Sequence, residues 1–423
     1  MSGSQPLKSY SLSVAQQDVP SSWMPEARPR LANSSARRIV SVASQSGTVN
    51  AGQPLLFQLP ANMGSGFMVS GSAYVKFTCN VTQAVAYSWA FKQSGSGASV
   101  FQRISAILSG QNVESLNMAN KLYNSLLLHA TNQQYLESDA KIHDQVFPGA
   151  FNTGQSVTVC VPIPLGVFNA QQHLPLFLLS SALLQIDTES VLQAITQGSG
   201  DAVTNYTISD ASLVFENLVP EPAYEQGIKA MLASRVYQMK IDTFHNSRYA
   251  QQASITQTIG LNSSSVRCIL WGTQPTQTQR NAGHLTDGGQ TQCYVYADGA
   301  LVHNANLSQV SQQFLEMNRC LNLMFDTSRT SAGPLANTAG NAVANDISLS
   351  LCDRTNYASG AYLGGLSLNR ENITNGEFSF VGTPVQNLVV QWNGTASTGE
   401  FFVFCAVQQI LTIDMAGSVN LIR

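Results

Sequence analysis

The sequence has few charged residues, which make up 11% of its 423 residues, against about 25% in a typical soluble domain. There are 21 Lys and Arg against 24 Asp and Glu, for a formal net charge of −3. Without a basic excess, the chain is not suited to bind duplex nucleic acid over a broad face, and coiled coils need more Glu, Lys and Arg. Its polar surface must come from uncharged side chains and Gly, which favours an all-β protein rich in turns.

Cysteine pairs, a signal peptide and a membrane-spanning run are also missing. The seven cysteines are scattered singly, with no C-x-x-C spacing, so we expect free thiols and a reducing assembly compartment. The polar N-terminus has no apolar signal core, and we therefore expect no secretion through a signal peptide. The longest apolar stretch, residues 174–186, is shorter than the about 20 residues that a membrane span needs.

Motifs that carry chemistry do not emerge from the sequence. It has no G-x-S-x-G elbow, no phosphate-binding glycine loop, and no histidines at H-x-H or H-E-x-x-H spacing. His143-Asp144 is open to two interpretations, half of a general-base pair or part of a surface loop, and the second is favoured because strand neighbours point to opposite faces. We therefore expect no enzyme activity, no catalytic residues, no cofactor, no metal ion and no small-molecule substrate.

Strand patterns fill both halves of the chain, and each half contains one helix pattern. Residues 69–78 alternate between apolar and mostly polar side chains, which is typical of a half-buried antiparallel strand. Apolar residues three and four apart predict helices over residues 113–128 and 307–324, the second with Ser308 as its cap. Each half thus has early strands, one amphipathic helix and late strands, which predicts two β-sandwiches in tandem.

Three tryptophans, Trp89, Trp271 and Trp392, lie inside these strand patterns. They could pack in a core or form a flat platform for a sugar ring. Their position within strands favours packing, and we expect them to be buried.

Residues 1–35 have no periodicity and contain four prolines among Ser and Gln. We expect an extended N-terminal arm that needs a partner surface to become ordered. The basic residues in and just after this segment are Lys8, Arg28, Arg30, Arg37 and Arg38. They are candidate contacts to phosphates of lipid head groups or of a genome, and the alternative is a solvated tail.

Several local segments occur in an order that resembles one family. The segments are residues 107–117 followed by 119–123, 161–168 followed by 174–176, 211–219 with the following helix, and 365–368, 378–380, 389–392, 402–407 and 411–414 near the end. Together they resemble the double jelly-roll major capsid proteins of tailless icosahedral viruses. This lineage includes membrane-containing phages, adenovirus hexon, virophages, polinton-like viruses and adintoviruses, and the resemblance covers about residues 36–423.

The resemblance implies an all-β fold of two tandem eight-stranded jelly-roll β-sandwiches with short helices in the loops. The arm would occupy residues 1–35, the first jelly roll 36–219, a connector helix 220–235 and the second jelly roll 236–423. It also implies a homotrimer that forms a pseudo-hexagonal capsomer of an icosahedral virion shell around the genome. The implied partners are neighbouring capsomers, penton and minor capsid proteins, and an internal membrane or the genome through the arm.

Two other functions remain open from the residues alone. The first is another virion or adhesin protein built from β-sandwiches. The second is a carbohydrate-binding or carbohydrate-cleaving β-sandwich, which is suggested by the low charge and the aromatic content. It predicts a groove with clustered carboxylates and exposed Trp side chains.

Overall fold

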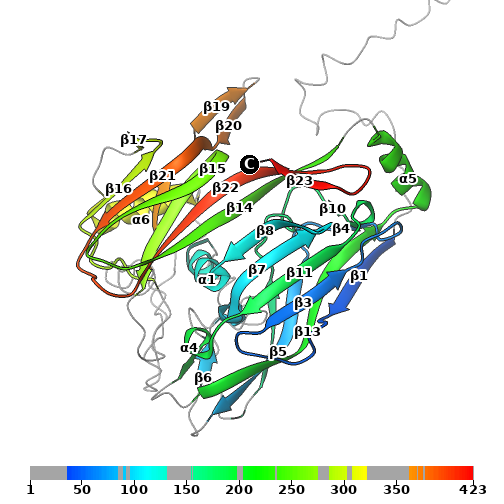
Figure 1. Ribbon diagram of the computed structural model, residues 1–423, viewed down its shortest axis with the longest axis horizontal. Helices are drawn as coiled ribbons and strands as arrows, with labels where there is room; N and C mark the ends of the chain where they lie inside the picture. Colours follow the sequence, from blue (N-terminus) through cyan, green and yellow to red (C-terminus); the bar gives the residue numbers. More distant parts are fainter. Residues whose placement is uncertain are drawn as a thin grey trace, which may run out of the picture.

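The structure is a computed structural model that describes residues 36–83, 89–91, 96–130, 154, 156–197, 203–233, 236–274, 285–302, 307–321, 362–368, 370–374 and 377–422. The predicted arm and the His143-Asp144 pair lie outside the described residues. The described chain is dominated by antiparallel strands with short helices between them (Figure 1), which confirms the all-β prediction.

Two large antiparallel sheets form most of the described chain before Pro220. The first contains β1 (Ala36–Ala43), β2 (Val49–Asn50), β4 (Phe67–Met68), β5 (Tyr74–Gln83), β9 (Val157–Pro162), β10 (Leu174–Pro175) and β13 (Val203–Val219). The second runs in the order β3 (Pro54–Leu59), β11 (Ala182–Thr188), β7 (Phe101–Leu108) and β8 (Gln111–Asn117). A separate pair joins β6 (Trp89–Phe91) to β12 (Ile195–Gln197). Alternate residues of these strands are buried, and they form the core of the first unit.

The predicted strand over residues 69–78 is wrong at its start, because β5 begins only at Tyr74. Before it the chain turns at Gly71, whose φ is +73°. The hydroxyl of Ser72 closes this turn by donating to the carbonyl oxygen of Val69 at 2.6 Å. From Tyr74 onwards the predicted alternation holds, with Val75, Phe77 and Cys79 fully buried.

An eight-stranded sheet forms the second unit. Its strands are β14 (Tyr237–Ala250), β15 (Ser254–Gln274), β16 (Gln292–Ala297), β17 (Ala300–Leu301), β18 (Gly364–Ser367), β21 (Thr383–Asn393), β22 (Glu400–Ile413) and β23 (Val419–Ile422). A two-stranded ribbon, β19 (Arg370–Thr374) with β20 (Glu377–Val381), extends from it.

The long strand β15 changes its partner along its length. Residues 254–260 pair with β21, whereas 268–274 pair with β22, and register shifts separate the two stretches. Asn262 lies in this irregular stretch with a φ of +42°. Because such bulges bend a strand, β15 belongs to both parts of the sheet. Trp271 of β15 and Trp392 of β21 meet in the core as a result.

Short helices connect the strands. They are α1 (Ala119–Ala130), α4 (Val191–Ala194), α5 (Pro222–Met231) and α6 (Val310–Cys320), with 3-10 turns η2 (Gly97–Val100) and η3 (Leu176–Leu178). In the described ranges, no helix is both long and apolar enough to cross a membrane.

Both helices begin later in the structure than predicted, at Ala119 and Val310 instead of residues 113 and 307. Residues 111–117 form β8, because Ser109 and Gly110 turn the chain back onto β7 so that Leu116 lies opposite Ile104. The chain enters α1 only after Met118, whose φ is +50°. The helix predicted from residue 307 begins at Val310 after Gln309, so the Ser308 cap is wrong. Leu307 instead is buried ahead of the helix, where its carbonyl oxygen accepts from two glutamine side chains.

The two units lie side by side. β8 at the edge of the four-stranded sheet contacts β14 at the edge of the eight-stranded sheet (Figure 1). Between the units in sequence, β13 ends at Val219, α5 spans Pro222–Met231 and β14 begins at Tyr237.

Candidate functional site

A buried carboxylate lies at the junction between the two units. Glu114 of β8 is 5% exposed. Its Oε1 accepts from the backbone N–H of Gly166 and its Oε2 from that of Val167, both at 2.9 Å. The side chain of Thr243 in β14 also hydrogen-bonds to it. Burial raises the pKa of Glu114, and the three hydrogen bonds oppose that rise in part.

Backbone of the two units comes into direct contact beside this carboxylate. A Cβ added to Gly166 would lie 2.0 Å from the carbonyl oxygen of Asp242 in β14. Further along β14, the Asn246 side-chain amide donates to the carbonyl oxygen of Asn117. Before these contacts, the Tyr237 hydroxyl donates to the His173 carbonyl oxygen at 3.0 Å. The strand is therefore attached to the first unit at several points along its length.

The connecting helix α5 is anchored by a second buried carboxylate. Glu225 is 1% exposed and accepts from the backbone N–H groups of Gly64 at 2.8 Å and Gly66 at 3.1 Å. Gly66 has a φ of +69°, and a Cβ there would lie 2.3 Å from the Leu218 carbonyl oxygen. Glycine is thus required for the close approach that places these two N–H donors beneath the helix.

A buried polar cluster ties α1 to α4 and to Glu189, which lies between β11 and α4. Lys121 donates to Oε1 of Gln193 at 3.1 Å, and Asn120 donates to Oε2 of Glu189 at 3.2 Å. Burial lowers the pKa of Lys121 to about 8, and the nearby carboxylates of Glu189 and Glu400 oppose this change. These partners explain the cluster as a packing feature of α1.

The three tryptophans predicted to be buried are in the core. In the second unit, Oε1 of Gln290 accepts from the indole N–H groups of Trp271 at 2.9 Å and Trp392 at 3.1 Å. The Tyr362 hydroxyl donates to the same atom at 3.1 Å. Because these side chains are enclosed, none of them offers a platform for a sugar ring.

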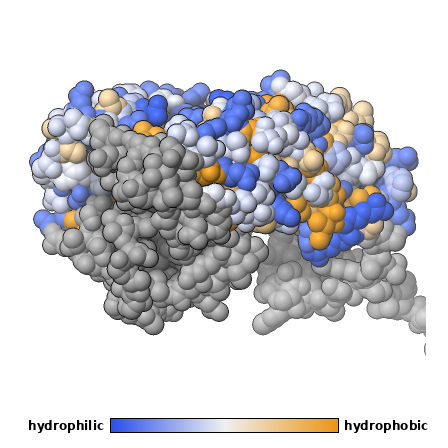
Figure 2. All heavy atoms as spheres, turned by 90° about the horizontal axis from the view of Figure 1, so that it is seen from below, coloured by the Kyte–Doolittle hydropathy of each residue, from blue (hydrophilic) through white to orange (hydrophobic). Residues whose placement is uncertain are grey.

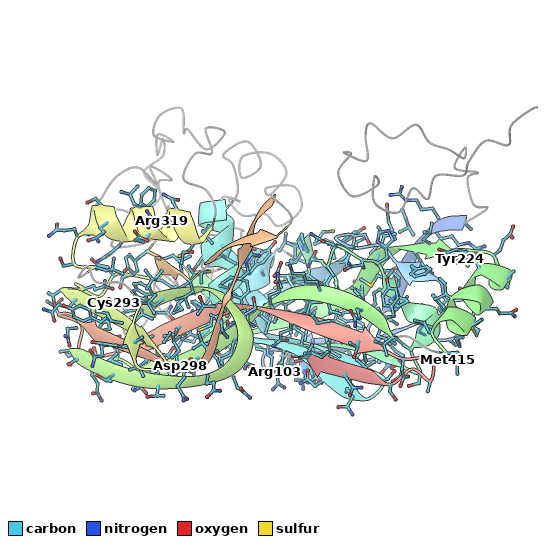
Figure 3. All side chains as sticks on the ribbon, turned by 90° about the horizontal axis from the view of Figure 1, so that it is seen from above. Arg103, Tyr224, Cys293, Asp298, Arg319 and Met415 are labelled. Atoms are coloured by element: carbon cyan, nitrogen blue, oxygen red, sulfur yellow. The ribbon has the colours of Figure 1, made fainter. Side chains whose placement is uncertain are left out.

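Catalytic and metal-binding arrangements do not emerge from the described part of the chain. Within it, no three His, Cys, Asp or Glu side chains come together in a way that could hold a metal ion. An open concavity of about 840 Å³ borders Asp298, on the side of the molecule opposite Arg319 of α6 (Figure 3). The Asp298 carboxylate accepts from the backbone N–H groups of Gln386 and Asn387, so its role there is to hold a turn.

Two of the five basic residues singled out in the sequence lie in the described chain. Arg37 and Arg38 belong to β1, which pairs with β13 and is exposed over most of its length. The Arg37 guanidinium pairs with Glu216, its Nε lying 3.0 Å from Oε2. Lys8, Arg28 and Arg30 are outside the described residues. The described contacts therefore do not show whether these five residues bind phosphates.

Apolar side chains are also exposed, at several separate places. They are Ile39, Met63, Tyr224, Val236, Leu301, Leu315, Ile410, Met415 and Ile422. Ile39 in β1 is 77% exposed, and Ile410 and Ile422 lie directly opposite each other on β22 and β23. On the face seen in Figure 2, apolar patches lie among hydrophilic and intermediate residues. Among these described side chains, only the cross-strand pair of Ile410 and Ile422 is shown to be contiguous, and contiguous exposed apolar surface is a feature of proteins that bind other proteins.

The buried acids were missed as individual functional residues in the sequence. Glu114 lies within the longer segment, residues 107–117, that carries the resemblance, and Glu225 lies within the predicted connector. The available signal for Glu114 was an acid within a strand of buried Val113 and Leu116. The donors that satisfy it come from residues 166 and 167, a pairing that no local pattern contains.

Comparison with known proteins gives a result only at the level of structure. No family model and no curated protein matches the sequence. The PBCV-1 virus capsid matches 94% of this chain and 98% of its own, with 12% identity and a TM-score of 0.61. The Faustovirus major capsid protein matches 98% and 94%, with 8% identity and a TM-score of 0.57. The mavirus major capsid protein matches 100% and 96%, with 12% identity and a TM-score of 0.51.

These matches extend over nearly the whole of both chains, and so include both units and the junction between them. At 8–12% identity they establish the fold and nothing finer. The chain has the double jelly-roll fold of viral major capsid proteins.

Proposed function

We propose that this protein is a viral major capsid protein, a structural subunit without enzymatic activity. The observation that carries the proposal is the match of both jelly rolls, in their side-by-side arrangement, to known major capsid proteins. The junction built on Glu114 and the anchored α5 support it, since a shell subunit must present its two jelly rolls as one stable unit.

The functional assembly proposed here is a homotrimer. Three copies would place six jelly rolls around one axis in a pseudo-hexagonal capsomer, and closed symmetry of this kind buries self-complementary surfaces. The low charge of the chain supports self-association, because uncharged amide and hydroxyl groups cost less to desolvate than ions. The exposed apolar side chains on β1, β22 and β23 are candidates for these contacts.

The wider setting follows from the same proposal. The capsomers would pack against neighbouring capsomers and against penton and minor capsid proteins in an icosahedral virion shell that encloses the genome. Assembly would take place inside the host cell. We assign the arm to residues 1–35, the jelly rolls to 36–219 and 236–423, and the connector to 220–235. The arm would reach an internal membrane or the genome beneath the shell.

The mass and outline of the purified protein test this function. Three chains of 45.4 kDa give a particle of about 136 kDa. We expect light scattering to find one discrete species of that mass, and negative-stain images of the same peak to show hexagonal outlines. A monomer that persists across salt and pH and never assembles would overturn the proposal.

The carbohydrate-active alternative is not favoured. It predicts exposed Trp side chains, whereas Trp89, Trp271 and Trp392 are buried. A glycan array on the folded protein would provide the direct check, and we expect no binding.

A further inference from the structure

Two cysteines of the second jelly roll come together from distant parts of the sequence. Cys268 lies in β15, and Cys320 is the last residue of α6. Their thiols are in hydrogen-bond contact. Cys268 is 5% exposed, whereas Cys320, at the end of α6, is only partly buried.

The packing of α6 on the sheet explains this contact. In β18, Gly365 lies opposite Leu270 and Ser367 lies opposite Cys268. A Cβ added to Gly365 would lie 3.0 Å from Sγ of Cys320 and 2.9 Å from Cα of Met317. The missing side chain at Gly365 therefore lets the last turn of α6 lie directly on β18 and β15, which brings the Cys320 sulfur to the sheet.

Two other buried cysteines of the second jelly roll, Cys293 and Cys405, are not placed to react with this pair. Cys293 of β16 is fully enclosed, and only burial raises the pKa of its thiol. Cys405 of β22 lies opposite Ile269, one position away from Cys268 along β15. Directly opposite residues of an antiparallel pair share a face, and successive residues alternate. Cys405 thus points to the other side of the sheet from Cys268 and from α6.

We propose that Cys268 and Cys320 form an oxidation site, at which a small-molecule disulfide such as oxidised glutathione converts the two thiols into a disulfide that ties the end of α6 to β15. This proposal goes beyond the capsid function and does not depend on it. The conditions in which it operates are those met when a protein leaves a reducing cell interior for an oxidising exterior.

The reaction proceeds by two thiol–disulfide exchanges. The Cys320 thiol loses its proton, and the thiolate attacks one sulfur of oxidised glutathione; a mixed disulfide forms and one glutathione thiolate leaves. The Cys268 thiolate then attacks Sγ of Cys320, which forms the protein disulfide and releases the second glutathione. The two protein thiols are oxidised, one oxidised glutathione is reduced to two molecules of glutathione, and the protons pass to the two leaving thiolates.

Burial of the Cys320 thiol sets the rate at which the two cysteines are oxidised. Burial and the Cys268 thiol raise the pKa of Cys320, while the guanidinium of Arg319 opposes that rise. The thiolate is therefore scarce at neutral pH, and the pair stays reduced unless an oxidant is supplied. Once formed, the bond closes a loop of about 50 residues between positions 268 and 320, and loops of this length give substantial stabilisation.

Peptide mapping of the full chain tests the proposal. The purified protein is incubated with oxidised glutathione, alkylated under denaturing conditions without reductant, and digested. We expect one cross-linked product that joins the peptides carrying Cys268 and Cys320, with Cys293 and Cys405 alkylated. The melting temperature should rise by about 5 °C or more, and dithiothreitol should reverse the rise.

Serine variants provide the controls. C320S and C268S should each lose both the cross-link and the rise in melting temperature, whereas C293S should keep them. If C268S does not fold, C320S still decides, because Cys320 is at a partly buried helix end. A cross-link between Cys268 and Cys405, a stable glutathione adduct on Cys320 without closure, or the same rise in C320S would overturn the proposal.

Discussion

The carboxyl group of Glu114 accepts hydrogen bonds at the point where β8, the turn at residues 166–167 and β14 meet. Two of its donors are backbone N–H groups, which stay in place whatever side chain occupies position 114. Removal of the carboxyl group therefore leaves buried donors without an acceptor, and such donors cost more than the lost hydrogen bonds themselves.

Replacement of Glu114 by Ala should lower the free energy of unfolding by about 2–5 kcal/mol. The cost has two parts: the unsatisfied N–H groups of Gly166 and Val167, and the cavity left by the side chain. Urea unfolding followed by tryptophan fluorescence provides the measurement. Asp210→Asn is the matched control, because Asp210 is exposed and its φ of +52° is well tolerated by Asn. A loss in E114A no larger than that in D210N would contradict the role assigned to Glu114.

The raised pKa of Glu114 gives stability a defined dependence on pH. In the folded state the group holds its proton to higher pH than in the unfolded chain. The folded state therefore binds more protons between the ordinary Glu pKa of about 4.3 and the raised value. Over that window the contribution of Glu114 to stability falls as pH rises, and it is constant above the raised pKa.

Glu114→Gln removes this titration and keeps the size of the side chain. We expect the stability of E114Q relative to the wild type to improve as pH rises from the ordinary Glu pKa of about 4.3 to the raised value, because only the wild type must ionise a buried carboxyl group. Urea unfolding of both proteins at each pH measures the difference. A difference that is flat, or that moves the other way, would show that the pKa of Glu114 is not raised by folding.

At the scale of the elements, local patterns predicted the strands well and the element boundaries poorly. The alternation around Val75 and Phe77 marked β5 because its two faces differ in burial. The helix predicted from residue 113 failed because Leu116 fits the apolar face of a helix and of a strand equally well. The Ser109-Gly110 turn decides between the two by folding residues 111–117 back onto β7.

Glycine substitutions in two elements should have opposite effects. Gly110 in the β7–β8 turn has a φ of +78° with nothing within 4 Å of an added Cβ, so G110A should cost about 1–2 kcal/mol through backbone strain alone. Gly227 lies in the exposed middle of α5, and an added Cβ meets nothing. G227A should therefore stabilise the protein by about 0.5–1 kcal/mol. Thermal unfolding of both variants measures the two shifts, and a shift of the same sign in both would refute this explanation.

At the scale of the whole molecule, the tandem order of elements was visible in the sequence, and the junction was not. Two sets of strands, each with one helix, could be located because hydrophobic periodicity is local. The satisfaction of Glu114 by Gly166 and Val167, and of Glu225 by Gly64 and Gly66, joins residues 52 to 161 positions apart. Such pairings form only once the fold has brought the residues together, so local patterns in the sequence cannot predict them.

Deletion of the N-terminal arm tests whether the arm contributes to shell assembly. Residues 1–35 are the proposed arm, and the first described strand, β1, begins at Ala36. Deletion of residues 1–35 should therefore leave the folded trimer at its full-length stability and lower the yield and stability of assembled shells. An unchanged shell yield would end the assignment of the arm to the inner face of the shell.

Charge variants then identify what the arm binds. If Lys8, Arg28 and Arg30 contact phosphates, their triple replacement by Gln should weaken assembly on anionic vesicles or nucleic acid. It should also reduce the salt dependence of assembly, because fewer phosphate contacts release fewer counterions on binding. R37Q provides the contrast, since Arg37 is already paired with Glu216 and its loss should change the salt dependence little. If the triple variant changed the salt dependence by only about three times the change in R37Q, in proportion to the charge removed, the binding would be assigned to overall charge and not to the arm.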